Sequence, residues 1–454
     1  MARINGGSAK QTGAKSAKEY KESDHVEADV ANHVVSAATL ENRLPPSRVR
    51  PFSKATISKP LWMKALLGRD PSPSREEFDA LVDALWDGDA PMDSLLDWMY
   101  DIGVGDGRKL FEQALEHGVE SVADAPAPLK HFFAMVDRDP PWLDRDLVAE
   151  GMRFIHRTGL AGPFILRDFA LMGGYLLSAF NHALVLTGAL NKEAGQRIAE
   201  TGKWWMDCTE LGGLERFGDG FKTTLRVRMI HALVRKNLQK RTEWDNGKWG
   251  LPINQTDTVA TYLAFGVVML IGVRALGIPA SPKESKAVMH LWKYAGWLMG
   301  VEERWLADTE REGLVLLYQT YMTQSQADWT SKELGSALAQ EPLKRRYPWQ
   351  AKHPMLHSML TKALYHQHLS TTSLFLNGEQ RDSLGLPKNI VPWYPLMTAG
   401  PRLLRYVSGN LTQKGRRKLE ASGRQAQHWA MGTMAKVKDQ KIIQPKEHHP
   451  AYTD

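Results

Sequence analysis

The stretch "TLRVRMIHALVRKNL", residues 224–238, reads as one amphipathic helix from end to end. Four side chains recur at the i, i+4, i+7 and i+11 spacing of a buried helix face, namely Val227, His231, Val234 and Leu238. Positive charges surround this stripe, namely Arg226, Arg228, Arg235 and Lys236. The fold that buries the stripe must therefore also account for an imidazole on the apolar side of a basic helix.

Helical patterns extend through most of the chain from residue 61 onward, and strand-like alternation is scarce. Ser74 and Ser281 each precede an amphipathic run as helix caps do, and Gly118 closes another. The longest apolar run, residues 259–273, is shorter than the roughly 18–20 residues of a membrane span. We therefore predict an all-α protein with one large helical core and a buried helix at this run.

Composition limits the classes of site. The chain has 454 residues, of which 43% are hydrophobic and 24% charged, as in ordinary globular proteins. Its single cysteine, Cys208, excludes an intrachain disulfide and a four-cysteine zinc site, and it fits a reducing compartment. The net charge of +7 is concentrated after Pro401, but no nucleic-acid-binding motif accompanies it, so we expect no nucleic-acid partner.

Three regions follow from composition. Residues 1–50 are polar and expected to be a disordered lead-in, residues 51–405 form the all-α domain, and residues 406–454 form a flexible basic tail. The tail is either a solvated segment or a peripheral contact to a membrane surface. Because the N-terminus lacks the apolar region of a secretory signal, we expect a cytoplasmic protein.

His231 has two interpretations. A lone histidine on an apolar helix face is more often a hydrogen-bonded core residue than a ligand. However, Arg228 and Arg235 flank it and would keep the imidazole neutral, which is the form that binds metals. No second ligand motif lies nearby, so a metal held by this residue indicates haem, whose macrocycle supplies the other four ligands itself. The neighbouring arginines would suit the haem propionates.

A second stripe lies in "RIAETGKWW", residues 197–205. Arg197, Thr201 and Trp204 share one helix face at i, i+4 and i+7. These side chains either face a pocket that holds a polarised diatomic ligand, or they are a surface arginine above a packed threonine and tryptophan.

Together the two stripes carry a resemblance. The pairing of "RIAET" (197–201) with "RVRMIHALVR" (226–235) resembles the catalytic domain shared by latex clearing proteins, which are bacterial rubber oxygenases, and by the fungal oxygenase that cleaves a prenyl chain during mycophenolic acid synthesis. "DPPWLDRDLVAEGMRFIHRTG" (139–159), "HLWKYAGWLMGV" (290–301) and "LGLP" (384–387) are also similar. The resemblance covers roughly residues 140–387.

The resemblance implies a globin-like helical bundle that encloses a non-covalently bound haem b with its iron. By position, His231 would be the proximal iron ligand, and Arg228 matches an arginine near the haem. Arg197 and Thr201 match a distal arginine and threonine, so both are candidate catalytic residues and Arg197 also a cofactor contact. The implied reaction uses dioxygen to cleave a carbon–carbon double bond in an apolar, prenyl-like molecule.

Two positions depart from the rubber enzymes. Glu200 stands where they have a lysine that can occupy the distal iron position. A catalytic glutamate of those enzymes falls near Asn181 and His182, neither of which is a carboxylate. A non-catalytic haem-binding or gas-sensing protein is therefore the first alternative to an oxygenase, and a helical scaffold without cofactor is the second. His182 and His290 are the other candidate axial ligands if His231 is not one.

Overall fold

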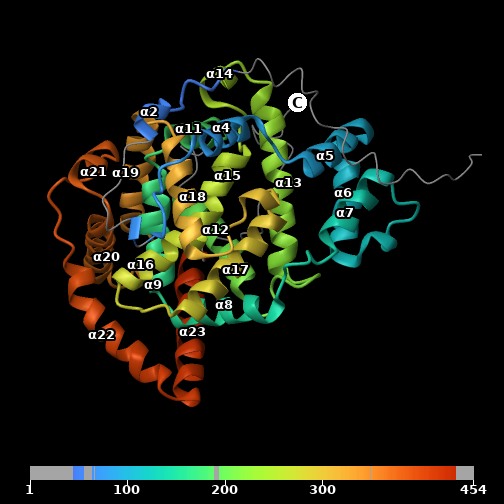
Figure 1. The fold of residues 1–454 in the computed structure, drawn as a ribbon. Coiled ribbons are helices and arrows are strands. Elements are labelled where there is room, and N and C mark those ends of the chain that lie inside the picture. Colours follow the sequence, from blue (N-terminus) through green and yellow to red (C-terminus); the bar gives the residue numbers. More distant parts are fainter. Residues whose placement is uncertain (1–43, 56–63, 66, 189–193, 348, 436–454) are drawn as a thin grey trace, which may run out of the picture. The chain divides into compact units, whose positions relative to one another are not determined.

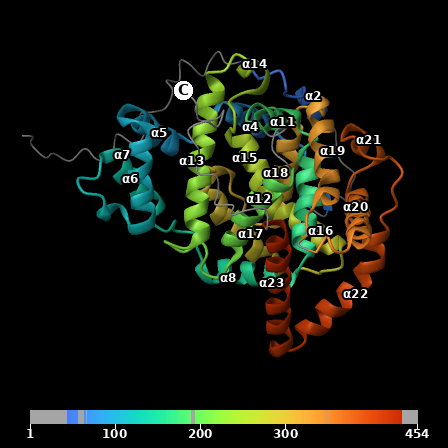
Figure 2. The same cartoon turned by 180° about the vertical axis from the view of Figure 1, so that it is seen from behind.

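The structure, a computed structural model, describes residues 44–55, 64–65, 67–188, 194–347 and 349–435. Its regular elements within these ranges are all helical, which confirms the predicted all-α class (Figures 1 and 2). The described residues from Pro45 onward belong to one unit. The N-terminal helices are α2 (Phe52–Ala55), α4 (Arg75–Asp83), α5 (Ala90–Ile102), α6 (Val104–His117) and α7 (Ala127–Val136).

The middle of the chain contributes the helices of the main core. They are α8 (Arg145–Arg157), α9 (Ala161–Ile165), α10 (Met172–Gly174), α11 (Ser178–Leu186), α12 (Ala194–Thr209), α13 (Asp219–Gln239), α14 (Asn246–Trp249), α15 (Gln255–Leu263), α16 (Met269–Ala275) and α17 (Pro282–Leu298). The C-terminal helices are α18 (Glu310–Met322), α19 (Trp329–Lys344), α20 (Pro354–Phe375), α21 (Gly378–Ser383), α22 (Trp393–Asn410) and α23 (Gln413–Ala435).

Helix α17 is buried on nearly all sides and packs along α8. Its predicted cap is present, since Ser281 Oγ accepts from the Glu284 amide while the Glu284 carboxylate accepts from the Ser281 amide at 2.9 Å. Gly151 of α8 allows the two helices to approach closely, because a Cβ there would lie 2.5 Å from the carbonyl oxygen of Ala287. The predicted caps Ser74 of α4 and Gly118 of α6 are also confirmed.

The apolar run at residues 259–273 is a buried core helix, as predicted. It continues from α15 through a π-helical segment, Ala264–Val268, into α16, and Leu263 and Val267 are fully buried. By length and composition, Gln255–Ala275 is apolar enough to cross a membrane, and so is the bent pair of α9–α10 with α11. The packing of the run against the other helices explains its apolar character without a membrane.

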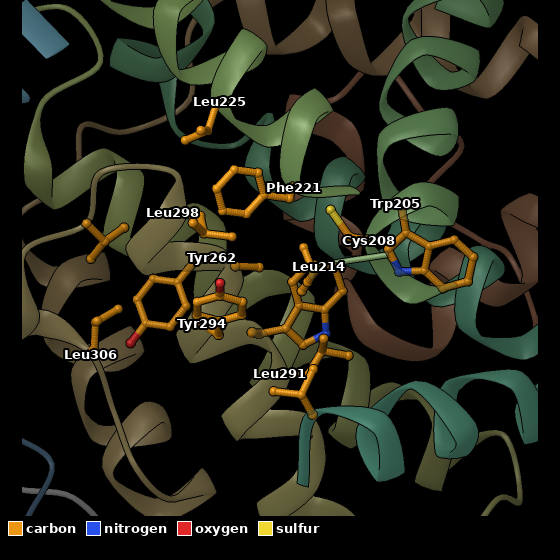
Figure 3. Close-up of a cluster of buried hydrophobic side chains, with 14 of the residues drawn as sticks. Trp205, Cys208, Leu214, Phe221, Leu225, Tyr262, Leu291, Tyr294, Leu298 and Leu306 are labelled. Atoms are coloured by element: carbon orange, nitrogen blue, oxygen red, sulfur yellow. The ribbon is translucent and has the colours of Figure 1, made fainter. Parts of the chain in front are cut away.

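The main core lies between α12, α13, α15 and α17, and part of it is drawn in Figure 3. Its side chains include Trp205, Cys208, Phe221, Leu225, Tyr262, Leu291, Tyr294 and Leu298. Each large apolar side chain contributes about 1.5–3 kcal/mol when it is fully buried. Burial also raises the pKa of the Cys208 thiol, so this cysteine behaves as a small apolar residue.

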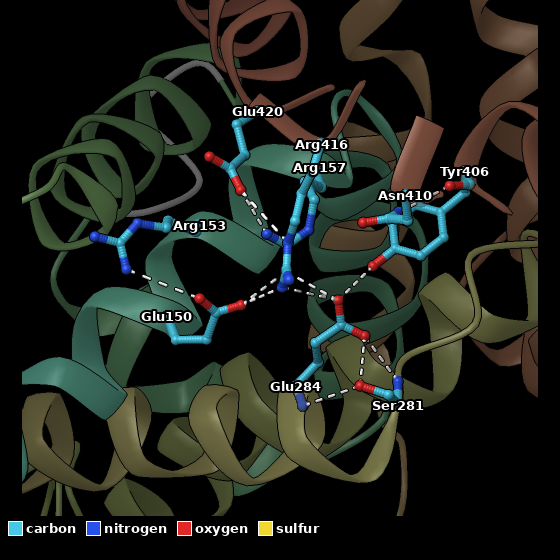
Figure 4. A network of polar contacts seen from close by, with 9 residues as sticks. All are labelled: Glu150, Arg153, Arg157, Ser281, Glu284, Tyr406, Asn410, Arg416 and Glu420. Atoms are coloured by element: carbon cyan, nitrogen blue, oxygen red, sulfur yellow. Dashed lines mark hydrogen bonds and ion pairs between the residues drawn. The ribbon is translucent and has the colours of Figure 1, made fainter. Parts of the chain in front are cut away.

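The C-terminal region differs from the flexible tail expected at residues 406–454. Helices α22 and α23 are regular, and they are tied to α8 and α17 by a network of polar contacts (Figure 4). Arg157 of α8 is buried and donates to Glu420 at 2.6 Å and to Glu284 at 2.9 Å. The Tyr406 hydroxyl donates to Glu284 at 2.8 Å. Residues 436–454 lie outside the described residues.

The prediction failed because α23 packs through polar groups. Gln427 is buried and donates to the carbonyl oxygens of Ile155 at 2.9 Å and Gly159 at 3.0 Å. Arg424 is also buried and donates to the carbonyl oxygen of Met206 at 2.7 Å. Satisfied hydrogen bonds make such burial tolerable, and an apolar stripe is then not required.

The N-terminal boundary also lies earlier than residue 50. Residues 1–43 of the expected lead-in lie outside the described residues, but Arg48 is buried and forms an ion pair with Asp257. Its guanidinium also donates to the carbonyl oxygen of Trp249 at 3.0 Å. The helical unit therefore includes the last residues of the expected lead-in.

Candidate active site

The basic side chains of α13 are neutralised by acidic residues of α5 and α6 and of the loop before α5. Arg228 is buried and donates to both carboxylate oxygens of Asp89 at 2.6 and 2.7 Å, and to the carbonyl oxygen of Leu298. Arg235 contacts Asp93 at 2.8 Å. The outer two residues form further pairs, Arg226 with Glu112 and Glu116, and Lys236 with Asp97. The ion pairs anchor α13, and they leave Arg228 occupied by protein groups.

His231 lies on the same helix between these two arginines. It is half-buried, and none of the described residues makes a hydrogen bond to its ring. The pKa of His231 is lowered to about 4, mainly by burial and also by the charge of Arg235, while the carboxylate of Asp89 opposes both effects. The imidazole is therefore neutral near pH 7, and its lone pair is available to a ligand.

Helix α12 lies antiparallel beside α13. Trp204 Nε1 donates to Thr224 Oγ1 at 2.9 Å, which fixes the register of the two helices. Arg197 and His231 each lie seven residues from this contact, or about 10 Å along each helix axis, in the same direction. The register therefore places Arg197 and His231 at similar heights along the two helices.

Arg197 uses only part of its hydrogen-bond donors. Its Nη2 donates to the Tyr175 hydroxyl at 3.3 Å, and its guanidinium carbon lies 6.0 Å from the centre of that ring. Its Nε and Nη1 are buried, and among the described residues they have no acceptor. A buried donor without a partner costs about 1–3 kcal/mol, so these atoms indicate a place for an external acceptor.

Near Arg197, helices α12 and α15 each expose a threonine side chain to solvent. Thr201 of α12 and Thr261 of α15 are both exposed, although each lies on a helix of the main core. One turn away the two helices close, since the rings of Trp204 and Phe265 are 5.1 Å apart. His231 itself lines a separate small cavity of about 10 Å³, and Thr258 of α15 also lines this cavity. That volume holds about one water molecule.

The two departures from the rubber enzymes have structural partners. Glu200 accepts a hydrogen bond from Gln196 at 3.1 Å. Asn181 is buried and donates its amide to the carbonyl oxygen of Tyr175 at 2.8 Å, while His182 pairs with Asp328 at 2.8 Å. Neither Asn181 nor His182 therefore takes the place of a free catalytic carboxylate.

His182 and His290 are less available than His231. His182 stacks on Trp249 with ring centres 4.3 Å apart, and His290 Nε2 accepts from the Asp144 amide at 2.9 Å. No group of three or more His, Cys, Asp or Glu side chains in the described part of the chain is arranged to hold a metal ion.

Sequence reasoning missed three polar partners. Two of them are Asp89, which pairs with Arg228, and Tyr175, which accepts from Arg197. No sequence pattern was strong enough to predict either contact. The third is a buried pair in which His368 Nδ1 lies 2.8 Å from Asp168, which Arg167 also contacts at 2.6 Å. Adjacent charged residues inside the apolar run "FILRDFALM" were the available signal for that pair.

Comparisons with known proteins agree with this architecture. The family described as "ER-bound oxygenase mpaB/B'/Rubber oxygenase, catalytic domain" matches residues 156–407, a range that contains Arg197, Thr201, Arg228 and His231. A "Rubber oxygenase" of Streptomyces sp. (strain K30) is 23% identical over 258 residues, which are 56% of this chain and 61% of that protein. The chain therefore matches less than two thirds of the length of that relative.

A solved structure is similar in fold. The "Structure of Latex Clearing Protein LCP in the closed state" superposes with a TM-score of 0.57 at 19% identity, and it covers 76% of this chain and 91% of that one. At this identity the likeness concerns the fold alone. Because the family match spans more than half of the sequence, the chain belongs to the mpaB/rubber oxygenase catalytic-domain family.

Proposed function

We propose that the protein is a haem b-dependent oxygenase that cleaves a carbon–carbon double bond in an apolar, prenyl-like molecule. Membership in an oxygenase family supports the reaction class. The observation that carries the proposal is that adjacent helices carry a neutral His231 and an Arg197 whose buried Nε and Nη1 have no acceptor among the described residues. A ligand-accepting imidazole and unused donors on facing helices suit a cofactor and a polar reactant between them.

The residues fit a haem in three respects. His231 offers a neutral imidazole, Arg197 offers two buried donors, and the nearby faces of α12 and α15 retain exposed side chains at Thr201 and Thr261. A single protein ligand is sufficient for haem, because the porphyrin itself supplies four nitrogen ligands to the iron. His231 would hold the iron, and the cavity beside it in this structure has room for about one water.

Arg228 has a different role from the one expected. Its guanidinium is committed to Asp89 and to the Leu298 carbonyl, so it orients α13 rather than contacting a propionate. Arg235 is likewise engaged by Asp93. We propose that these ion pairs hold the His231 ring in a fixed position, as partners of a ligand-bearing element commonly do.

The haem would supply the redox chemistry with dioxygen. Arg197 would donate from Nε and Nη1 to negative charge that develops on a reacting oxygen, and such preorganised donors act strongly where water is excluded. Thr201, on the same face of α12, would add a hydroxyl donor. Neither residue is needed to hold the iron.

The substrate class rests on the family and on the surroundings of the site. The name of the Streptomyces relative says that it oxidises rubber, and we transfer to this chain only an apolar, unsaturated, prenyl-like substrate. Trp204, Phe265 and Trp292 pack into an aromatic cluster one turn from Thr201, and such apolar surroundings would favour this molecule over a polar one. We also propose a cytoplasmic location, which fits a small prenyl-like substrate better than an extracellular polymer.

A non-catalytic haem-binding or gas-sensing role is the second candidate. Asn181 favours it, because this buried amide is tied to Tyr175 and Ser331 where the rubber enzymes place a catalytic glutamate. Oxygen consumption separates the two roles. Haem-loaded protein is incubated with linear isoprenoid alkenes and their saturated counterparts, and products are identified by mass spectrometry. We expect alkene-dependent oxygen uptake and carbonyl products, whereas haem binding without uptake for any alkene would overturn the oxygenase proposal.

A further inference from the structure

Helix α22 turns an apolar face outward. The side chains along this outer stripe are each 42–77% exposed, namely Leu396, Met397, Leu403, Leu404, Val407 and Leu411. Their spacing of three, four and seven residues places them on one side of the helix. In Figures 1 and 2, α22 runs along the edge of the ribbon beside α20 and α23, which are its neighbours in the fold.

The opposite face of α22 holds the helix in this orientation. Pro395 and Tyr406 are buried, and the Tyr406 hydroxyl donates to Glu284 of α17 (Figure 4). The backbone amide of Tyr394 donates to Ser370 of α20 at 2.9 Å. Because both ends of the inner face are fixed, the apolar stripe cannot turn inward without breaking these contacts.

The charges around the outer stripe have one sign. Residues 383–419 contain seven Lys and Arg side chains and no Asp or Glu. Of these cations, Arg405, Lys414, Arg417 and Lys418 are exposed next to or beyond the stripe. Arg416 instead points toward the protein, where it contacts Glu150 at 2.6 Å.

The apolar stripe and the cations around it together favour an anionic membrane surface over a second copy of the chain. In a symmetric dimer the stripe would face its own copy, and the cations of residues 383–419 would meet like charges with no acidic residue of that segment to compensate them. An anionic bilayer surface offers both apolar chains for the leucines and negative headgroups for the cations. Trp393, 41% exposed at the start of the helix, suits the boundary between headgroups and acyl chains.

We infer that the outer stripe of α22 docks the protein onto an anionic lipid surface, with α22 lying in the plane of the interface. The membrane contact is therefore a folded helix face and not a flexible tail. The inference does not depend on the proposed oxygenase activity, because it rests only on the apolar stripe and on the surrounding charges.

Vesicle flotation with the full chain tests this inference. Vesicles of phosphatidylcholine alone are compared with vesicles that also contain phosphatidylserine. We expect at least about tenfold more bound protein on the anionic vesicles, because each cation near the surface adds binding energy. The variant Leu396→Glu/Leu404→Glu should lose this binding by about tenfold or more, since it places charge in the apolar stripe.

The matched control is Met355→Glu/Leu356→Glu, which alters two exposed apolar residues at the other end of α20 from Ser370. It should bind vesicles as the unmodified protein does. Circular dichroism and any visible cofactor spectrum should be unchanged in both variants, which separates docking from the proposed haem site. Equal binding of the stripe variant, or no preference for phosphatidylserine, would overturn the inference. So would a dimer in light scattering that the stripe variant abolishes, because it would identify a second copy as the occupant.

Discussion

Helices α13 and α12 both bring charged side chains to the candidate site, yet the partners they find are different. On α13, Arg228 and Arg235 are matched by carboxylates from Asp89 and Asp93. On α12, Arg197 keeps two buried donors without an acceptor among the described residues. This difference matches the proposed roles, in which α13 would hold the His231 imidazole in place and α12 would present donors to a group outside the described residues.

The ion pair that anchors α13 provides the largest expected effect. Asp89→Asn removes the charge but keeps the side-chain cap of α5, so it isolates the pair with Arg228. Leaving a buried guanidinium without its carboxylate should lower the free energy of unfolding by about 3–5 kcal/mol, as measured by chemical denaturation.

The control for this variant is Asp106→Asn, because Asp106 forms an exposed pair with Lys109. It should leave the denaturation midpoint nearly unchanged, as exposed pairs contribute little. If the two variants behave alike, α13 is not anchored by Asp89.

The unused donors of α12 provide the second test. Arg197→Ala should retain haem and fold normally, but its oxygenation rate should fall about 10²–10³-fold, as when one preorganised donor is removed. Thr201→Val should show a milder loss. Lys203→Ala, which alters an exposed residue of the same helix, should keep full activity. Release of haem from Arg197→Ala would instead make this residue a cofactor anchor.

The pKa of His231 predicts a smaller, pH-dependent effect. Its folded-state pKa of about 4 lies below the ordinary value of 6.5. The unfolded chain therefore binds more protons between these values, and the free energy of unfolding should decrease as pH falls from about 6.5 to 4. His231→Gln should show a shallower decrease, and the difference between the two denaturation series isolates His231 from other buried histidines such as His156. Parallel series would contradict the assigned pKa.

The sequence allowed the helical elements to be predicted, because local periodicity and caps determine them: the caps at Ser74 and Ser281 and the buried run at residues 259–273 follow from spacing within one helix. The predicted buried stripe of α13 was wrong, since of its four residues only Leu238 is buried and His231 is half-buried. The buried face of α13 instead carries Phe221, Leu225, Met229 and Ala232. The roles of Arg197 and His231 were implied by resemblance alone and stay predictions.

The partners of these helices could not be predicted. Asp89 lies 139 residues before Arg228, so no local pattern connects them. Helix α23 was missed because Arg424 and Gln427 are buried against backbone carbonyls, and their residue types favour a solvated segment. The outward apolar stripe of α22 was missed as well, since periodicity alone does not show which face of a helix is covered.

The most direct measurement of the central claim is the visible spectrum of His231→Ala, purified and haem-reconstituted beside the unmodified protein and His131→Ala, an exposed control on α7. The account predicts a Soret band for the unmodified protein and the control. His231→Ala should remain helical with little or no haem, and added imidazole should restore the band by replacing the lost ligand. Normal haem content and Soret position in His231→Ala, or no haem binding by the unmodified protein, would contradict the assignment of His231 as the iron ligand.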